Sequence, residues 1–72
     1  MTEGEYRVGI TFNPGGNEMV NKIKRAAADL IDLVGTVEGT GEVARLRALA
    51  QTHIEDAAMW GVKAATKPKR EP

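Results

Sequence analysis

The chain has 72 residues, enough for one small domain whose core, taken alone, is close to the lower limit of stability. It contains no cysteine, so disulfides and thiolate metal sites are excluded as sources of stability, and oligomerisation is the usual remaining one. Ten acidic and ten basic side chains cancel to zero formal charge, which argues against non-specific binding of DNA or RNA.

The first five residues are polar and acidic, unlike a secretory signal, and no apolar run approaches the length that spans a bilayer. Without cysteine or an export signal, we expect a cytoplasmic protein that does not engage a membrane. The pattern divides the chain into an N-terminal arm over 1–16, a helical hairpin over 17–67 and a flexible, charged tail over 68–72.

A first helix is predicted over about 17–35. Asn17 or Gly16 suits its N-cap, and Glu18 in the first turn is favoured by the helix dipole. Its apolar stripe recurs at spacings of three and four and consists of Val20, Ile23, Ala27, Leu30, Ile31 and Val34. Three glycines between positions 35 and 41 end the helix and form the connection.

A second helix is predicted over about 41–66, and Pro68 with the charged tail ends it. One stripe of this helix alternates spacings of three and four, as a coiled-coil seam does, so we expect it to pack against the first helix. This predicted seam contains Val43, Leu46, Ala50, His53, Ala57, Trp60 and Ala64.

A neighbouring stripe of the second helix is also apolar and contains Ile54, Ala58, Gly61 and Ala65. A helix that is apolar on most sides must be buried on most sides, and one partner helix does not cover both stripes. We therefore expect contacts between chains, with the small residues Ala57, Ala58 and Gly61 allowing close approach. The predicted fold is all-α: an antiparallel two-helix hairpin with a short N-terminal arm, assembled into a symmetric oligomeric helical bundle.

The arm is less determined by its pattern. Residues 7–12 alternate weakly, which leaves a short strand, one turn of helix and an extended segment all open. The sequence Asn13-Pro14-Gly15-Gly16 is typical of a turn that redirects the chain into the first helix.

Catalytic chemistry has little support in this sequence. The single histidine, His53, falls on the predicted seam, where an imidazole buried at a helix interface is the favoured interpretation. No Ser-His-Asp or Cys-His arrangement can be assembled from one chain, and a metal site would need ligands from another chain. We therefore expect no enzyme, no metal site and no cofactor.

Aromatic and basic residues gather in the arm and the start of the first helix. Tyr6 and Phe12 have no place in a two-helix seam, and Lys22, Lys24 and Arg25 follow closely. The cations alone are more typical of a solvated face, but rings beside cations favour a stacking and phosphate-binding site. Lys63, the one charge in an apolar stretch next to Trp60, either extends this chemistry or snorkels to solvent.

These residues follow the order of a known family. Tyr6-Arg7, then Asn21-x-Ile23-Lys24 at a helix start, then Thr52, Met59 and Lys63 in a last helix make up the pattern. It resembles the phage anti-CBASS cyclic-oligonucleotide sponges, whose helical hairpin is shared with sponges that counter Thoeris defence. The resemblance covers about residues 6–68.

The resemblance implies a compact hexamer that binds cyclic dinucleotides, and in some members cyclic trinucleotides, in pockets between protomers. It implies sequestration of the signal without cleavage in the cytoplasm of an infected bacterial host, which blocks anti-phage defence. Tyr6 would stack on a base and Lys24 would pair with a phosphate. The cyclic dinucleotide site expected on this basis comprises Tyr6, Arg7, Phe12, Asn21, Lys24 and Arg25.

A second nucleotide site is implied at Lys63, together with Thr52 and Trp60. The chain departs from the family pattern in the insert 12–16, which lengthens the arm and makes Phe12 a candidate to share or replace the stacking role of Tyr6. It also carries Lys63 where the family pattern has arginine, which weakens the argument for bidentate phosphate recognition there.

Two alternatives to a sponge remain open on sequence alone. The first is a small helical-hairpin adaptor or inhibitor of a host protein, with the basic residues serving only solvation. The second is a nucleic-acid-binding protein, which zero net charge disfavours and which would depend on Lys67, Lys69 and Arg70 in the tail.

Overall fold

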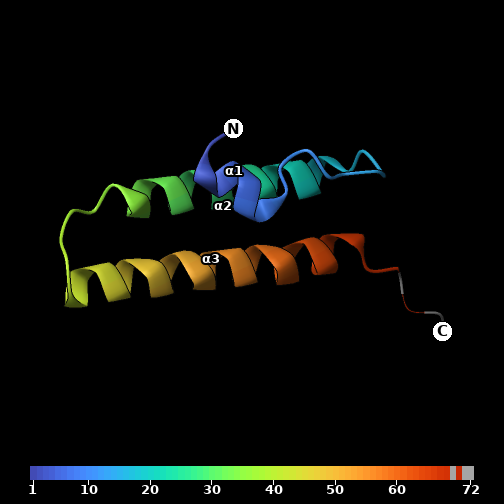
Figure 1. Cartoon of the computed structure of the whole chain (residues 1–72). Helices are drawn as coiled ribbons and strands as arrows, with labels where there is room; N and C mark the ends of the chain where they lie inside the picture. The colour runs from blue at the N-terminus through green and yellow to red at the C-terminus, as the bar shows by residue number, and fades with distance from the viewer. Residues whose placement is uncertain (69, 71–72) are drawn as a thin grey trace.

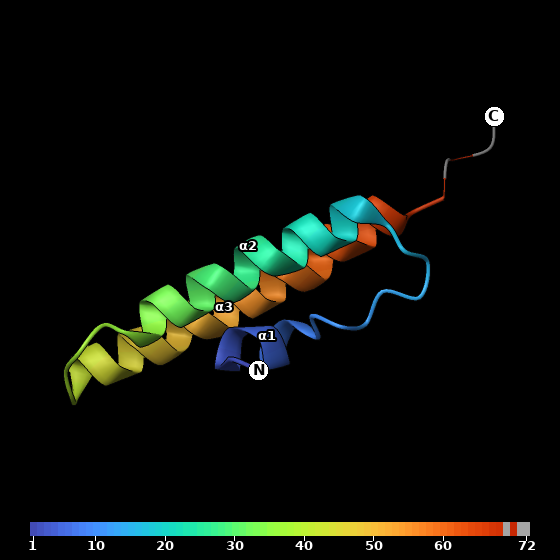
Figure 2. The ribbon, with the colours of Figure 1, turned by 90° about the horizontal axis from the view of Figure 1, so that it is seen from above.

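The computed structural model of the chain describes residues 1–68 and residue 70. Over this part, three helices follow one another: α1 (Glu3–Val8), α2 (Glu18–Gly35) and α3 (Glu42–Thr66). α2 and α3 form an antiparallel hairpin, and α1 lies against one side of that pair (Figures 1 and 2). The predicted all-helical class is confirmed for these residues, whereas positions 69, 71 and 72 of the predicted tail lie outside them.

Of the three conformations that the sequence leaves open for the arm, its first part adopts helix. The Thr2 hydroxyl accepts a hydrogen bond from the Glu5 N–H at 3.1 Å, and the Glu5 carboxylate accepts one from the Thr2 N–H at 2.8 Å. This reciprocal capping box starts α1 well before the weakly alternating segment 7–12. Gly9 ends the helix with φ 64°, a left-handed conformation that glycine adopts without strain.

α2 begins after Asn17, whose side-chain oxygen accepts a hydrogen bond from the Val20 N–H at 3.1 Å. Its buried line differs from the predicted stripe: Val20, Ala28 and Ile31 are buried, whereas Leu30 is about half exposed. The reason is that α1 covers the flank of α2 that contains Ala28, so the buried face is rotated away from Leu30.

The predicted seam of α3 is wrong for the single chain. Its members Leu46 and Trp60 are 52% and 56% exposed, and His53 is exposed rather than buried at a helix interface. The neighbouring stripe packs on α2 instead: Ala58 is buried, and a Cβ placed on Gly61 would lie 3.3 Å from Ile23. Small residues at these positions let the two backbones approach closely, so Ala58 and Gly61 serve the hairpin itself and not the predicted contact between chains.

The unused apolar stripes of the two helices share one side of the hairpin. α1 contacts α2 at Ala28 and reaches α3 at Glu55, and a helix turns 100° per residue. The large exposed apolar residues about 100–180° away from these contacts therefore lie on the opposite side. We call this surface the open face, formed by Met19, Leu30, Leu33, Val43, Leu46, Leu49 and Trp60.

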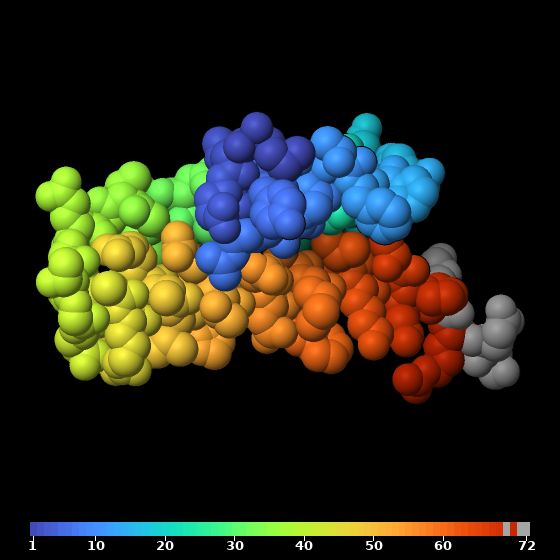
Figure 3. Space-filling model, viewed as in Figure 1, coloured from blue at the N-terminus to red at the C-terminus, as the bar shows by residue number. Residues whose placement is uncertain are grey.

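The N-terminal segment lies on the other side of the molecule, over α2 and along its border with α3, which Figure 3 views directly. No helix in the described residues has the length and apolar character needed to cross a membrane.

Candidate functional site

The site begins with the docking of α1 on α2, which depends on Gly4. The Gly4 N–H donates a hydrogen bond to Asp32 Oδ1 at 2.7 Å, and Gly4 is the buried residue of α1. A Cβ at this position would lie 2.1 Å from the Ala28 carbonyl oxygen. Only glycine therefore permits α1 to lie this close to α2, and this contact places Tyr6 and Arg7.

An exposed ion-pair network reinforces the docking of α1. Arg25 Nη1 donates to Glu5 Oε2 at 2.9 Å, and Arg25 Nη2 lies 2.8 Å from Asp29 Oδ1. Hydrogen bonds from the Thr2 backbone N–H, and next from Arg25, lower the pKa of the Glu5 carboxyl to about 2. The same carboxylates raise the pKa of Arg25. In the free chain Arg25 is therefore a partner of α1 and not an unoccupied phosphate ligand.

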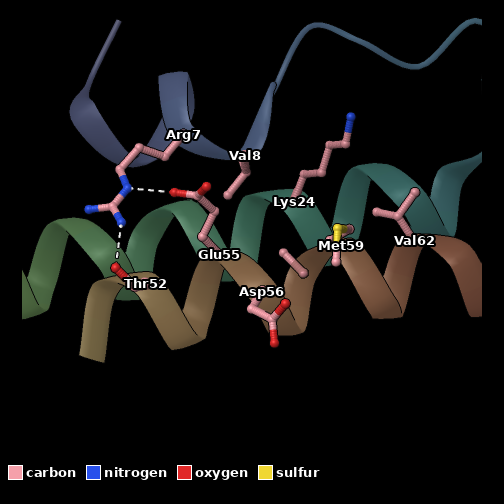
Figure 4. A pocket seen from close by; sticks show the side chains of 9 residues that line it. Arg7, Val8, Lys24, Thr52, Glu55, Asp56, Met59 and Val62 are labelled. Atoms are coloured by element: carbon pink, nitrogen blue, oxygen red, sulfur yellow. Dashed lines mark hydrogen bonds and ion pairs between the residues drawn. The ribbon is translucent and has the colours of Figure 1, made fainter. Parts of the chain in front are cut away.

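A groove of about 490 Å³ separates α1 from α3, and Figure 4 shows its lining. Arg7 Nε donates to Glu55 Oε1 at 2.7 Å, and Arg7 Nη2 lies 3.5 Å from the Thr52 hydroxyl. The structure thus brings together Arg7 and Thr52, which were expected in two different sites. Val8 and Met59 line the same groove as an apolar wall.

Lys24 lies at the far end of this groove and is 6% exposed. Its ammonium donates to the Gly9 carbonyl at 2.9 Å and to the Phe12 carbonyl, and it lies 5.5 Å from the centroid of the Phe12 ring. Within the described residues, Lys24 forms no ion pair with a carboxylate. In this part of the chain the buried positive charge is therefore compensated by carbonyl dipoles and an aromatic face.

The two aromatic rings of the arm face solvent. Tyr6 on α1 is 73% exposed and Phe12 is 71% exposed. An exposed ring has a free face on which a flat ligand can stack, and the Phe12 ring has Lys24 beside it. The arrangement supplies aromatic and cationic groups on the same side of the hairpin.

A second hollow, of about 660 Å³, lies where the arm meets the outer flank of α2. Ile10, Asn21, Lys22 and Arg25 line it. Asn21 is exposed, and its side-chain oxygen accepts a hydrogen bond from Asn13 Nδ2 at 2.9 Å. Asn21 and Arg25 thus belong to one surface, and each is held by a contact from the arm.

The residues expected in a second nucleotide site are only partly brought together. Lys63 Nζ lies 5.2 Å from the centroid of the Trp60 ring, so these two form a cation–π pair. Thr52 lies on the Arg7 groove, about 12 Å from Trp60 along the axis of α3. One chain therefore does not join all three residues into a single pocket.

Sequence patterns missed two residues that the site uses. Glu55 appears on α3 as a residue beside the predicted seam, and its role becomes visible only after α1 docks with Arg7. Asn13 is recognisable as part of a turn, but its three hydrogen bonds to Asn17 and Asn21 are not. The signal that was available is the preference of asparagine for hydrogen bonds to nearby backbone groups at turns and helix starts.

Acidic residues and His53 are not arranged as a metal centre in the part of the chain that the structure describes, where no group of three or more such side chains could hold an ion.

Comparisons with known proteins place the chain in a family. The family model described as the hairpin domain of Acb2/Tad1 matches residues 4–66, from α1 through the last turn of α3. Comparison with curated proteins and with solved structures found no match. The matched span includes the arm from residue 4 onward, both long helices and the residues of the groove. The chain therefore belongs to the Acb2/Tad1 hairpin-domain family, the family of anti-CBASS and anti-Thoeris sponges.

Proposed function

We propose that the protein is a non-catalytic sponge that binds cyclic dinucleotides, and cyclic trinucleotides in a second site, in the cytoplasm of an infected bacterial host. Sequestration of these immune signals would block anti-phage defence. Membership of the sponge family supports this role in general. The observation that carries the proposal is the ammonium of Lys24, which is buried without a carboxylate partner among the described residues and lies beside the exposed ring of Phe12.

The charge of Lys24 explains why an anion would bind here. Removing an ammonium from water is costly, and carbonyl dipoles compensate it less well than a full negative charge does. A phosphate of a cyclic dinucleotide would provide that charge at the end of the groove. The exposed rings of Tyr6 and Phe12 would stack on the bases, which is a contact that tolerates different bases.

The other expected residues complete the ligand site in this proposal. Arg7, fixed by Glu55, would present its remaining guanidinium N–H groups to the ligand at the edge of the groove. Asn21 and Arg25 would contact the ligand from the outer flank of α2. Each of these side chains already has a partner in the free chain, so the site is largely formed before the ligand arrives.

We further propose that the protein is a homo-oligomer, a hexamer by family resemblance, assembled through the open face. Among the described residues of the single chain, the buried apolar ones are Val20, Ala28, Ile31 and Ala58, and of these Ile31 is the large side chain that is almost fully buried. A core of this size leaves a monomer close to the lower limit of stability. Covering Leu46, Trp60 and their neighbours with a second copy would supply the missing burial.

Oligomerisation also bears on the proposed second nucleotide site. Lys63 and Trp60 form a pair on α3, but Thr52 of the same chain lies about 12 Å away along the helix. A site that uses all three residues would therefore take Thr52 from another protomer. Lysine at position 63 would contact a phosphate there as a single charge, without the two-point geometry of arginine.

Calorimetric titration of the protein with a panel of cyclic di- and trinucleotides tests the proposal. We expect one or more of them to bind, and Tyr6→Ala to weaken binding about tenfold or more because a base loses its stacking partner. Thr11→Ala, at an exposed position of the same arm, is the matched control and should bind normally. A folded protein that binds none of the panel would refute the sponge.

Native mass spectrometry of the protein mixed with the same panel would identify the bound ligand and its stoichiometry together. Assembly of several copies with bound cyclic nucleotide is the expected result. A monomer that still binds the nucleotide would contradict the pockets between protomers that the family resemblance implies.

A further inference from the structure

Residues 9–16, here called the strap, carry the chain from α1 to the start of α2. Inside the strap, the Phe12 N–H donates to the Gly9 carbonyl at 2.9 Å, and the Gly16 N–H donates to the Asn13 carbonyl at 3.0 Å. Gly15 and Gly16 have open space around the position of a side chain. The turn at the end of the strap therefore has little packing of its own to hold it in place.

Two side chains make the hydrogen bonds that fasten the strap to the beginning of the hairpin. Lys24 donates to the carbonyls of Gly9 and Phe12, as described above. Asn13 makes three bonds: its Nδ2 donates to the Asn17 carbonyl at 2.8 Å and to Asn21 Oδ1 at 2.9 Å, and its Oδ1 accepts from the Asn17 N–H at 3.2 Å. Asn13 thus ties the strap to the N-cap and first turn of α2.

The hydrogen bonds of Lys24 and those of Asn13 respond differently to a bound ligand. A phosphate competes with the carbonyls for the ammonium of Lys24, because a charged acceptor makes the stronger hydrogen bond. The hydrogen bonds of Asn13 are made with Asn17 and Asn21 and involve no cation. No positive charge there attracts the ligand phosphate, so these bonds remain in place. Phe12 is the residue next to Asn13, and its exposed ring depends on the position of the strap.

We propose that Asn13 is a positioning residue for the ligand site: it holds Phe12 over the site while Lys24 turns from the strap to the ligand phosphate. This inference rests on the proposed function. It assigns a binding role to the insert 12–16, and it makes the effect of Asn13 depend on the presence of the Phe12 ring.

A double-mutant cycle on the intact protein tests this dependence. Affinity for the best-binding cyclic dinucleotide is measured for the wild type, Asn13→Ala, Phe12→Ala and the double variant. We expect each single change to weaken binding roughly tenfold, from the loss of stacking or of the bonds that position it. The double variant should be little weaker than Phe12→Ala alone, because Asn13 acts through that ring.

The outcomes separate the inference from the function on which it rests. Unchanged affinity in Asn13→Ala, or a double variant weakened by the full product of about a hundredfold, would overturn the role of Asn13 and leave the sponge intact. A wild type that binds no cyclic nucleotide would overturn both. Circular dichroism checks that the helices persist in each variant.

Asn13→Ser provides a second variant with a graded expectation. A serine hydroxyl still accepts a hydrogen bond from the Asn17 N–H but does not reach Asn21 as well, so affinity should fall between the wild type and Asn13→Ala. Affinity for Asn13→Ser as low as for Asn13→Ala, with normal helix content, would overturn a positioning role for the Asn17 contact.

Discussion

Gly4→Ala is expected to detach α1 from the hairpin, although alanine is the better helix former. The added Cβ would lie 2.1 Å from the Ala28 carbonyl oxygen and 2.8 Å from Asp32 Oδ1. Ordinary contact begins at 3.4 Å, so α1 must retreat by about 1.3 Å at its closest point. Because the obstacle is backbone, no side-chain rotation relieves the overlap.

The retreat breaks the contact that docks α1. The Gly4 N–H to Asp32 hydrogen bond measures 2.7 Å, and a displacement of this size takes it outside hydrogen-bonding range. A hydrogen bond to a charged group contributes about 1.5–3 kcal/mol, so we expect the docked state of α1 to lose about 2 kcal/mol. In an undocked α1 the same substitution would instead stabilise the helix by up to about 1 kcal/mol. A less stable α1 in Gly4→Ala therefore indicates that α1 is docked in the wild type, and a more stable α1 indicates that it is not.

Hydrogen exchange of individual amides is the appropriate assay, because the loss is local. A destabilisation of about 2 kcal/mol predicts exchange roughly 30-fold faster at α1 amides such as that of Tyr6, with the amides of α3 little changed. Gly15→Ala is the matched control, since a Cβ there meets nothing within 4 Å and its φ is not positive. Slower exchange in α1 of Gly4→Ala, or exchange equal to that of the control, would refute the docking geometry.

Three further changes probe the assembly, the ion pairs and the buried charge. Leu46→Asp on the open face should weaken self-association about a hundredfold by sedimentation, whereas Ala48→Asp, exposed outside that face, should not. The pKa of Glu5 is lowered from 4.5 to about 2 by folding, so its stabilisation is present above pH 4.5 and is lost as the pH falls towards 2. Glu5→Gln should remove this part of the acid sensitivity in thermal unfolding, and an unchanged pH profile would contradict it. Lys24→Met should change the free energy of unfolding by less than about 1.5 kcal/mol in urea titrations, because an apolar chain of similar volume replaces a buried charge. The same variant should bind the cyclic dinucleotide about a hundredfold more weakly, and normal binding would exclude Lys24 as the phosphate ligand.

The two long helices were accessible from sequence because their signals are local. Apolar spacing over ten or more residues, Asn17 as an N-cap and the glycines after position 34 all act within a few residues of their effect. α1 was harder to predict from sequence. Its capping box, formed by Thr2 and Glu5, begins a helix of only six residues, which has no apolar stripe. Short helices depend on tertiary docking, which a local pattern does not describe.

The sequence pattern alone does not determine which of the two apolar stripes on α3 packs against α2. Both the stripe of Leu46 and Trp60 and the stripe of Ala58 and Gly61 recur with helical spacing, so periodicity does not rank them. The stripe of Leu46 and Trp60 was expected to pack on the first helix because it resembles a coiled-coil seam, and that resemblance selected the wrong face. Close approach of the backbones favours the small residues, and the contact between Ile23 and Gly61 shows that this effect decides the pairing within the chain.

The location of Lys24 illustrates why the site was only partly predictable. On the periodic pattern of α2, Lys24 flanks the apolar stripe and reads as a surface cation. Its burial arises from residues 15 and 12 positions earlier, Gly9 and Phe12, whose carbonyls the arm brings over it. A pattern of residue types contains no information on backbone carbonyls that converge from a distant segment, although it did place the rings and the cations in one region.

The two opposite faces of the hairpin differ in the kind of partner that each would bind. In the part of the chain that the structure describes, the buried ammonium on the side of α1 has no carboxylate partner, and large apolar side chains of the open face such as Leu46 and Trp60 are uncovered. An anionic ligand satisfies the first and a second copy of the chain satisfies the second, and neither can replace the other. If assembly positions two arms at one pocket, dissociation by Leu46→Asp should also weaken ligand binding, although Leu46 lies on the other side from Lys24. Retained affinity in a fully dissociated Leu46→Asp protein would show instead that each chain binds its ligand alone.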